Sequence, residues 1–193
     1  MNFWKRWWRR LARRRDDIAD HNRAIAQAPD DPAAYYARGL AYARRTCPAE
    51  LAALEGDLTR AIADYDRAIA LQPDYADAYV CRGIAYADQG NLDQALADYD
   101  RAIALEPDHA AAYYNRGLIF AERGDWEQAI VAWTMTLVFC PDDAAAYYNR
   151  GRAHLYCKDV DRAVTDLSTV LEMDCDPALK QHAELILETL AQT

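Results

Sequence analysis

The residues that could do acid–base chemistry are few and lie far apart along this chain. Its four histidines are His21, His109, His154 and His182. Catalysis needs polar groups that converge in a pocket, but the sequence contains no nucleophile elbow, no phosphate-binding loop and no HExxH segment. We interpret each histidine as a substituted aromatic residue, a loop residue or a cap residue. We therefore expect no catalytic residues, no cofactor and no enzyme activity.

The cysteines also lack a pattern that would hold a metal. They are Cys47, Cys81, Cys140, Cys157 and Cys175, with no CxxC pair and no histidine at metal-ligand spacing. An odd number of thiols indicates a reducing compartment rather than a set of disulfides. We expect free thiols that act as small buried residues between helices and no bound metal, with a redox or metal role as the alternative.

Charge is distributed unevenly along the chain. The net charge is −9, yet the first fifteen residues, MNFWKRWWRRLARRR, carry seven Lys/Arg and no acid. The rest holds the other 15 of the 22 basic residues against all 31 acidic ones, a net charge of −16. Such an acidic body would repel phosphates, so no nucleic-acid partner is expected. Because no run of about 20 apolar residues occurs and no apolar stretch follows the basic start, we expect a cytoplasmic protein.

A repeat of 34 residues organises most of the sequence. Three segments align without gaps, beginning at Ala76, Ala110 and Ala144. The same period separates the members of two further sets, which are Pro73, Pro107 and Pro141, and Gly83, Gly117 and Gly151. The small residues Gly83 and Ala95 are expected where two helices approach closely, and Gly90 and Gly124 in the turns between helices.

The residue types within this period resemble the tetratricopeptide repeat. That repeat has the order aromatic, Gly, aromatic, Ala, aromatic, Pro, which the second repeat meets with Tyr79, Gly83, Tyr86, Ala95, Tyr99 and Pro107. The fourth repeat is more degenerate, with His154 at an aromatic position and Cys175 where Pro is usual. The resemblance implies an all-α fold, an α-solenoid of helix-turn-helix hairpins wound into a right-handed superhelix, with a C-terminal capping helix.

The repeat divides the chain into seven segments. We expect a basic, Trp-rich amphipathic helix at 1–15, a half repeat (a second helix) at 16–31, a repeat with a ten-residue insertion at 32–75, repeats at 76–109 and 110–143, a degenerate repeat at 144–177, and a capping helix at 178–193. The apolar stripe of the cap is Leu179, Ala183, Ile186, Leu187 and Leu190. The insertion lies near Pro48 and predicts an extra turn or an extended helix, as a tolerated enlargement or as a contact site.

In proteins of this family the first helix of each repeat lines a concave groove that binds other proteins. Carried over by position, the resemblance implies a partner groove formed by Tyr36, Leu40, Val80, Ile84, Tyr114, Leu118, Tyr148, Arg152 and Tyr156. The positions that hold Lys, Asn and Arg in a carboxylate clamp are occupied here by Tyr36, Leu40, Val80 and Ile84. We therefore expect an amphipathic helix or an extended apolar peptide as the partner. Alternatively, the N-terminal segment or a second copy of the chain covers this groove. The second case would make the protein a homo-oligomer.

One departure from the family pattern recurs in the repeats. Arg stands immediately before the Gly where Leu is usual, at Arg38, Arg82, Arg116 and Arg150. A partly buried Arg needs an acidic partner, and Asp64, Asp98 and Asp166 are available in the second helices. Ala132 breaks this pattern in the third repeat. We interpret these pairs as structural.

The N-terminal segment separates aromatic from basic residues at helical spacing. Phe3, Trp4, Trp7, Trp8 and Leu11 share one face, and Lys5, Arg6, Arg9, Arg10 and Arg13 occupy the rest. Such a helix can lie on an anionic membrane or dock on a partner, through Trp4, Trp7, Trp8, Leu11, Arg6, Arg9 and Arg10. Packing on the chain's own repeats and an organelle-targeting peptide are the alternatives.

Two functions follow from the sequence. The first is a non-catalytic protein–protein interaction scaffold that binds a partner peptide or helix in its groove. The second is a peripheral membrane-associated assembly factor or complex subunit, which the N-terminal helix would anchor.

Overall fold

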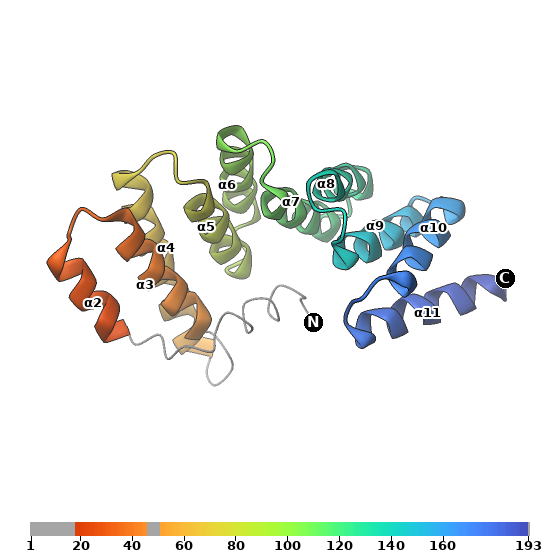
Figure 1. The fold of residues 1–193 in the computed structure, drawn as a ribbon, viewed down its shortest axis with the longest axis horizontal. Coiled ribbons are helices and arrows are strands. Elements are labelled where there is room, and N and C mark those ends of the chain that lie inside the picture. Colours follow the sequence, from red (N-terminus) through yellow and green to blue (C-terminus); the bar gives the residue numbers. More distant parts are fainter. Residues whose placement is uncertain (1–17, 46–50, 193) are drawn as a thin grey trace. The chain divides into compact units, whose positions relative to one another are not determined.

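The computed structural model describes residues 18–45 and 51–192, and in these residues it contains ten α-helices and no strand (Figure 1). The helices are α2 (Ile18–Gln27), α3 (Pro32–Arg45), α4 (Leu51–Leu71), α5 (Ala76–Asp88), α6 (Leu92–Leu105), α7 (Ala110–Glu122), α8 (Trp126–Phe139), α9 (Ala144–Tyr156), α10 (Val160–Glu172) and α11 (Pro177–Ala191). The all-α solenoid predicted from the repeat pattern is therefore confirmed. The handedness of the whole array stays a prediction.

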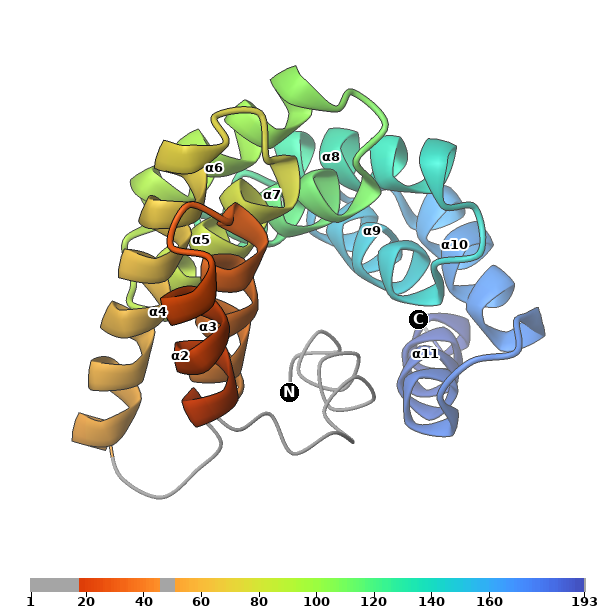
Figure 2. The same ribbon diagram turned by 60° about the vertical axis from the view of Figure 1, so that its left-hand side comes forward.

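The chain forms two compact units, Met1–Pro107 and Asp108–Thr193. In the first unit α3 packs against α4 and α5 against α6, while α2 lies against α3. In the second unit α7 packs against α8, α9 against α10, and α11 closes the end by lying against α10 and α9 (Figure 2). Each hairpin is thus one predicted repeat.

The two helices of a hairpin approach closely at a glycine. A Cβ added to Gly83 would lie 2.6 Å from the ring of Tyr99 and 3.2 Å from the carbonyl oxygen of Ala95. Both Tyr99 and Ala95 are fully buried. The predicted role of Gly83 and Ala95 is therefore confirmed, because any side chain at position 83 would push the helices apart.

The turns between paired helices use a left-handed backbone conformation. Gly90 and Gly124 have φ angles of +81° and +77°, which glycine adopts without steric cost. Lys158 holds the same position in the fourth repeat with φ of 62°. A residue with a Cβ is strained in this conformation. Among these three turns, the residue of the fourth repeat therefore suits its backbone conformation least.

The insertion of the first repeat lengthens a helix. Helix α4 has 21 residues, whereas α6, its counterpart in the second repeat, has 14. Of the two forms that the sequence predicted, an extra turn or an extended helix, the structure has the extended helix.

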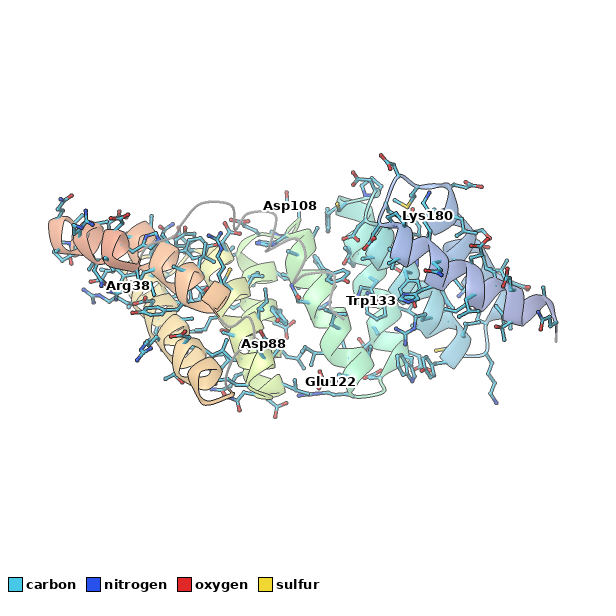
Figure 3. All side chains as sticks on the ribbon, turned by 90° about the horizontal axis from the view of Figure 1, so that it is seen from below. Arg38, Asp88, Asp108, Glu122, Trp133 and Lys180 are labelled. Carbon is cyan, nitrogen blue, oxygen red and sulfur yellow. The ribbon has the colours of Figure 1, made fainter. Side chains whose placement is uncertain are left out.

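Helix α11 covers the apolar end of the second unit. Leu179, Ile186 and Leu187 pack against a buried cluster formed by Leu167, Val170 and Ala183. The Nζ of Lys180, labelled in Figure 3, donates a hydrogen bond of 2.9 Å to the carbonyl of Leu171 near the end of α10. Of the five residues predicted for the stripe of the capping helix, Ala183 belongs to this cluster and three others pack against it, while Leu190 is half-buried.

Candidate protein-binding surface

In three of the four repeats, the Arg that precedes the helix-packing Gly makes a two-pronged pair with an Asp of the next helix. Arg82 donates through Nε and Nη2 to the two carboxylate oxygens of Asp98, at 2.9 and 2.6 Å. Arg38 binds Asp64 in the same way at 2.8 and 2.7 Å, and Arg150 binds Asp166 at 2.8 and 2.7 Å. All three carboxylates are buried, so the predicted structural role of these pairs is confirmed.

The remaining amino group of each of these three Arg reaches the preceding second helix. Nη1 of Arg82 donates to Asp66 at 2.6 Å, and that of Arg38 donates to Asn22 at 2.7 Å. The guanidinium of Arg82 also lies 5.4 Å from the ring centre of Tyr79. These arginines tie successive helices together, which leaves them little capacity for a partner protein.

The third repeat lacks the carboxylate, as predicted. Ala132 is fully buried at the position of Asp98, so its methyl group replaces the acid. Arg116 lies over the ring of Tyr113, 5.2 Å from its centre.

In the first unit, the predicted groove residues are largely packed against other side chains of that unit. The hydroxyl of Tyr36 forms a 3.5 Å hydrogen bond with the Sγ of Cys81, and its ring lies 4.9 Å from that of Tyr75. Leu40 packs on the buried cluster that contains Leu58 and Tyr65. Val80 is only 4% exposed and Ile84 is half-buried. Tyr36, Leu40 and Ile84 retain some exposed surface, whereas Val80 serves packing.

Burial also keeps the Cys81 thiol and the Tyr36 hydroxyl protonated. It raises the pKa of the Cys81 thiol to about 12 and, as the largest of several causes, raises the pKa of the Tyr36 hydroxyl as well. Both groups are therefore neutral at physiological pH, and Cys81 is not a reactive thiol. Cys140, Cys157 and Cys175 are free and only half-buried, so the expected buried role holds for Cys81 alone among these four.

In the second unit, Tyr114 lies inside the packing rather than on the surface. It is 4% exposed, and its hydroxyl accepts a 3.0 Å hydrogen bond from Nδ2 of Asn149 on the neighbouring helix α9. Its carbonyl accepts a 3.3 Å bond from Nε1 of Trp133, labelled in Figure 3. Leu118, one turn further along α7, is half-buried. Tyr114 is a packing residue like Val80, which corrects the expectation that a partner touches these two side chains.

Helix α9 carries the most accessible members of the predicted groove. Tyr148, Arg152 and Tyr156 follow one another at intervals of four residues, so they form one row along the helix. Tyr148 packs partly on the cluster beneath α11, and the guanidinium of the exposed Arg152 lies 5.6 Å from its ring centre. Within the part of the chain that the structure describes, Arg152 has no ion-pair partner.

Tyr156 ends this row on an aromatic support that the sequence patterns did not reveal. Its ring stacks on that of Trp126, with ring centres 3.9 Å apart and planes at 4°. The side chain of Tyr156 nevertheless stays 56% exposed. Trp126 begins α8 at the position of Leu92 and Val160 in the neighbouring repeats, and that substitution is the signal by which it could have been noticed.

Other predicted features lie elsewhere or outside the described residues. The docking residues of the N-terminal segment, Trp4, Trp7, Trp8, Leu11, Arg6, Arg9 and Arg10, fall outside residues 18–45 and 51–192, as does Cys47. Within those ranges, no three His, Cys, Asp or Glu side chains are grouped so that they could hold a metal ion. No described helix has the length and apolarity needed to cross a bilayer.

Comparison with solved structures returns proteins of the same architecture. A crystal structure of MamA is 26% identical with a TM-score of 0.68, and covers 80% of this chain and 85% of that chain. MamA 41-end from Desulfovibrio magneticus RS-1 is 21% identical with a TM-score of 0.70, over 90% and 97% of the two chains. A thermophilic TPR protein of Thermus thermophilus is 21% identical with a TM-score of 0.67, over 88% of each. The latter two likenesses show the fold alone.

Comparison with family models identifies the repeat directly. Models described as tetratricopeptide repeat match residues 82–134 and 144–176, and one described as TPR repeat matches residues 53–90 and 117–156. No curated protein sequence matches the chain. The matched ranges together run from residue 53 to residue 176, over the same hairpins that the Gly, Ala and aromatic positions define, and the chain belongs to the tetratricopeptide repeat family.

Proposed function

We propose that this protein is a non-catalytic scaffold that binds a helix or an extended apolar peptide of a partner protein along the first helices of its repeats. Proteins of this family and fold mediate protein–protein interaction, which supports the general role. The row Tyr148, Arg152 and Tyr156 on α9 is the observation that carries the specific proposal. The half-buried Tyr36, Leu40, Ile84 and Leu118 are proposed as additional contacts of their own units.

The composition of the row suits a binding surface. Tyr, Trp and Arg are the residue types that contribute most to binding energy in protein interfaces. Because Tyr156 is already held against Trp126, a partner that covers its free face orders little additional side chain. Arg152, stacked on Tyr148, offers donors to an acidic or carbonyl group of the partner.

Photo-crosslinking from defined positions tests this surface. A benzoylphenylalanine at position 156 of the full chain is expected to capture a specific protein from a lysate of the native host. Arg152→Glu in the same chain should remove that product, because it reverses the charge in the middle of the row. Crosslinking is read by mass spectrometry, which identifies both the partner and the attached segment.

The matched control places the same probe at position 138. Val138 is 63% exposed on α8, so it presents an apolar side chain to solvent outside the proposed row. It should not yield the product obtained from position 156. The same set of products from both positions, insensitive to Arg152→Glu, would remove α9 as the binding surface.

The second candidate function rests on the N-terminal segment. Its Trp residues and its Arg residues separate onto different helical faces, which favours attachment to anionic lipid and a role as a peripheral assembly factor or complex subunit. The full chain should float with vesicles that contain acidic phospholipid, and a chain without residues 1–15 should not. If both remain with the unbound protein, the membrane candidate is rejected.

A further inference from the structure

A pocket of the second unit lies on a different set of side chains from the proposed partner row. It has a volume of about 330 Å³ and is lined by residues of α8, α9 and α10. These three helices pack in that order (Figure 1). Its lining is mainly polar or charged: Ile130, Thr134, Arg150, His154, Arg162, Thr165 and Asp166. Nothing in the scaffold function uses these groups together.

The same positions two repeats earlier, in the first unit, have a different chemistry. There Asp66 replaces Thr134, Tyr86 replaces His154, and Gln94 replaces Arg162. With the Arg and Asp that both repeats share, the earlier set holds one basic and two acidic groups, whereas the pocket of the fourth repeat holds two basic groups and one acidic group besides its histidine. Each of the three substitutions makes the fourth-repeat pocket more favourable to an anion.

Arg150 and Thr134 both line this pocket and are joined to each other by a hydrogen bond. Arg150 is held by Asp166 through Nε and Nη2, and its Nη1 donates to Oγ1 of Thr134 at 3.2 Å. Because the Thr134 oxygen accepts this bond, its own hydrogen is available for donation. For Arg82 of the second repeat, Asp66 on α4 accepts from the same amino group at 2.6 Å, and a carboxylate there has no hydrogen to donate.

His154 and Arg162 supply the other donors. The His154 side chain is only 7% exposed, and its Nδ1 is 4.0 Å from the nearest carboxylate oxygen, of Asp159, which is too far for a hydrogen bond. Arg162 is anchored at one side by Asp159, 3.4 Å away, but its side chain stays 74% exposed. The lining of the pocket thus contains an imidazole ring, an exposed guanidinium and a hydroxyl.

We propose that this pocket binds a phosphate-sized oxyanion, either free or as the phosphoryl group of a monoester. Arg162 and the hydroxyl of Thr134 donate to its oxygens, Arg150 contributes charge from the base of the pocket, and His154 donates from its buried ring. A ring of histidine size leaves the space that Tyr86 occupies in the second repeat. This site is independent of the partner row on α9.

Nuclear magnetic resonance of the full chain with labelled histidine tests the site. Inorganic phosphate should shift the ring signals of His154 in a saturable way in roughly the millimolar range, as expected for a few charge-assisted hydrogen bonds in an open pocket. Sodium chloride at matched ionic strength serves as the reference. N-acetyl-phosphoserine amide forms a second arm, and the ligand with the tighter dissociation constant identifies the source of the phosphoryl group.

Variants taken from the other repeats provide the decisive comparison. Thr134→Asp, which restores the residue type of Asp66, should abolish the phosphate effect, and Arg162→Gln should weaken binding by roughly tenfold. Arg152→Gln removes the same charge from α9 outside the pocket and should leave the dissociation constant unchanged. The proposal fails if phosphate does no more than chloride, or if Arg152→Gln weakens binding as much as Arg162→Gln.

Discussion

The second and fourth repeats show how one helical framework can hold different surface chemistry. Both keep the two-pronged pair, Arg82 with Asp98 and Arg150 with Asp166, at closely similar distances. Around that pair the second repeat has Tyr86 and Gly90, with Asp66 on the preceding helix α4, whereas the fourth has His154 and Lys158, with Thr134 on the preceding helix α8. The contacts that join the helices are thus separable from the residues that surround them.

The largest expected effect concerns the acidic partner of the buried arginine. Asp166→Ala should lower the free energy of unfolding by about 3 kcal/mol, because it leaves Arg150 partly buried with Thr134 as its remaining side-chain contact on α8. Asp98→Ala should cost about 2 kcal/mol, since Asp66 still binds Arg82. Urea denaturation followed by circular dichroism measures both. Equal losses would show that the second carboxylate contributes nothing.

The next effect separates the two helix-packing glycines. An added Cβ at Gly83 would meet the buried ring of Tyr99 at 2.6 Å, so Gly83→Ala should cost about 2 kcal/mol. At Gly151 the nearest atom, Cγ of Leu167, is 3.1 Å away. There the crowding is offset by the higher helix propensity of Ala, and Gly151→Ala should change stability by less than about 1 kcal/mol. A Gly151→Ala variant as unstable as Gly83→Ala would contradict this ranking.

A smaller effect of opposite sign is expected in the fourth turn. Lys158→Gly should stabilise the protein by about 0.5–1 kcal/mol, because Gly adopts the φ of 62° without strain. Lys158→Ala is the control, since it removes the charge and keeps the Cβ. If the melting temperature rises equally for both variants, the gain in stability comes from the side chain rather than from the backbone.

The smallest effect is a dependence of stability on pH that His154 contributes. Burial, the largest cause, lowers the pKa of His154 from its ordinary value of 6.5, so protonation favours the unfolded chain. The stability that neutral His154 contributes is fully present above about pH 6.5, and it is lost as the pH falls below that value. His154→Phe, which copies Phe120 of the third repeat, should flatten the pH profile between pH 7 and 5. An unchanged slope would contradict the assignment.

The helices, their pairing and the arginine–aspartate pairs could be predicted because each depends on residues at a fixed spacing. Gly83 with Tyr99, and Arg82 with Asp98, recur with the repeat period, so position alone indicates the contact. The extended α4 was one of two forms that the sequence left open, since Pro48 indicates where a helix stops but not how far the next one reaches back.

The surface was less predictable because the exposure of a side chain depends on neighbours that the period does not specify. Val80 and Tyr114 occupy groove positions of the family pattern, yet both are buried. Tyr114 is held by Asn149, one repeat further along the chain. Trp126 was missed for the same reason: only the folded hairpins bring the start of α8 beside the end of α9, where its ring supports Tyr156.

Hydrogen–deuterium exchange tests the scaffold role most directly, when it is measured on the protein alone and with the partner that crosslinking identifies. Binding along the proposed row should slow amide exchange in α9 from Tyr148 to Tyr156, while α8 from Val131 to Phe139, whose exposed side chains lie outside the row, should exchange as before. Slower exchange confined to α8, with α9 unaffected, would contradict the account.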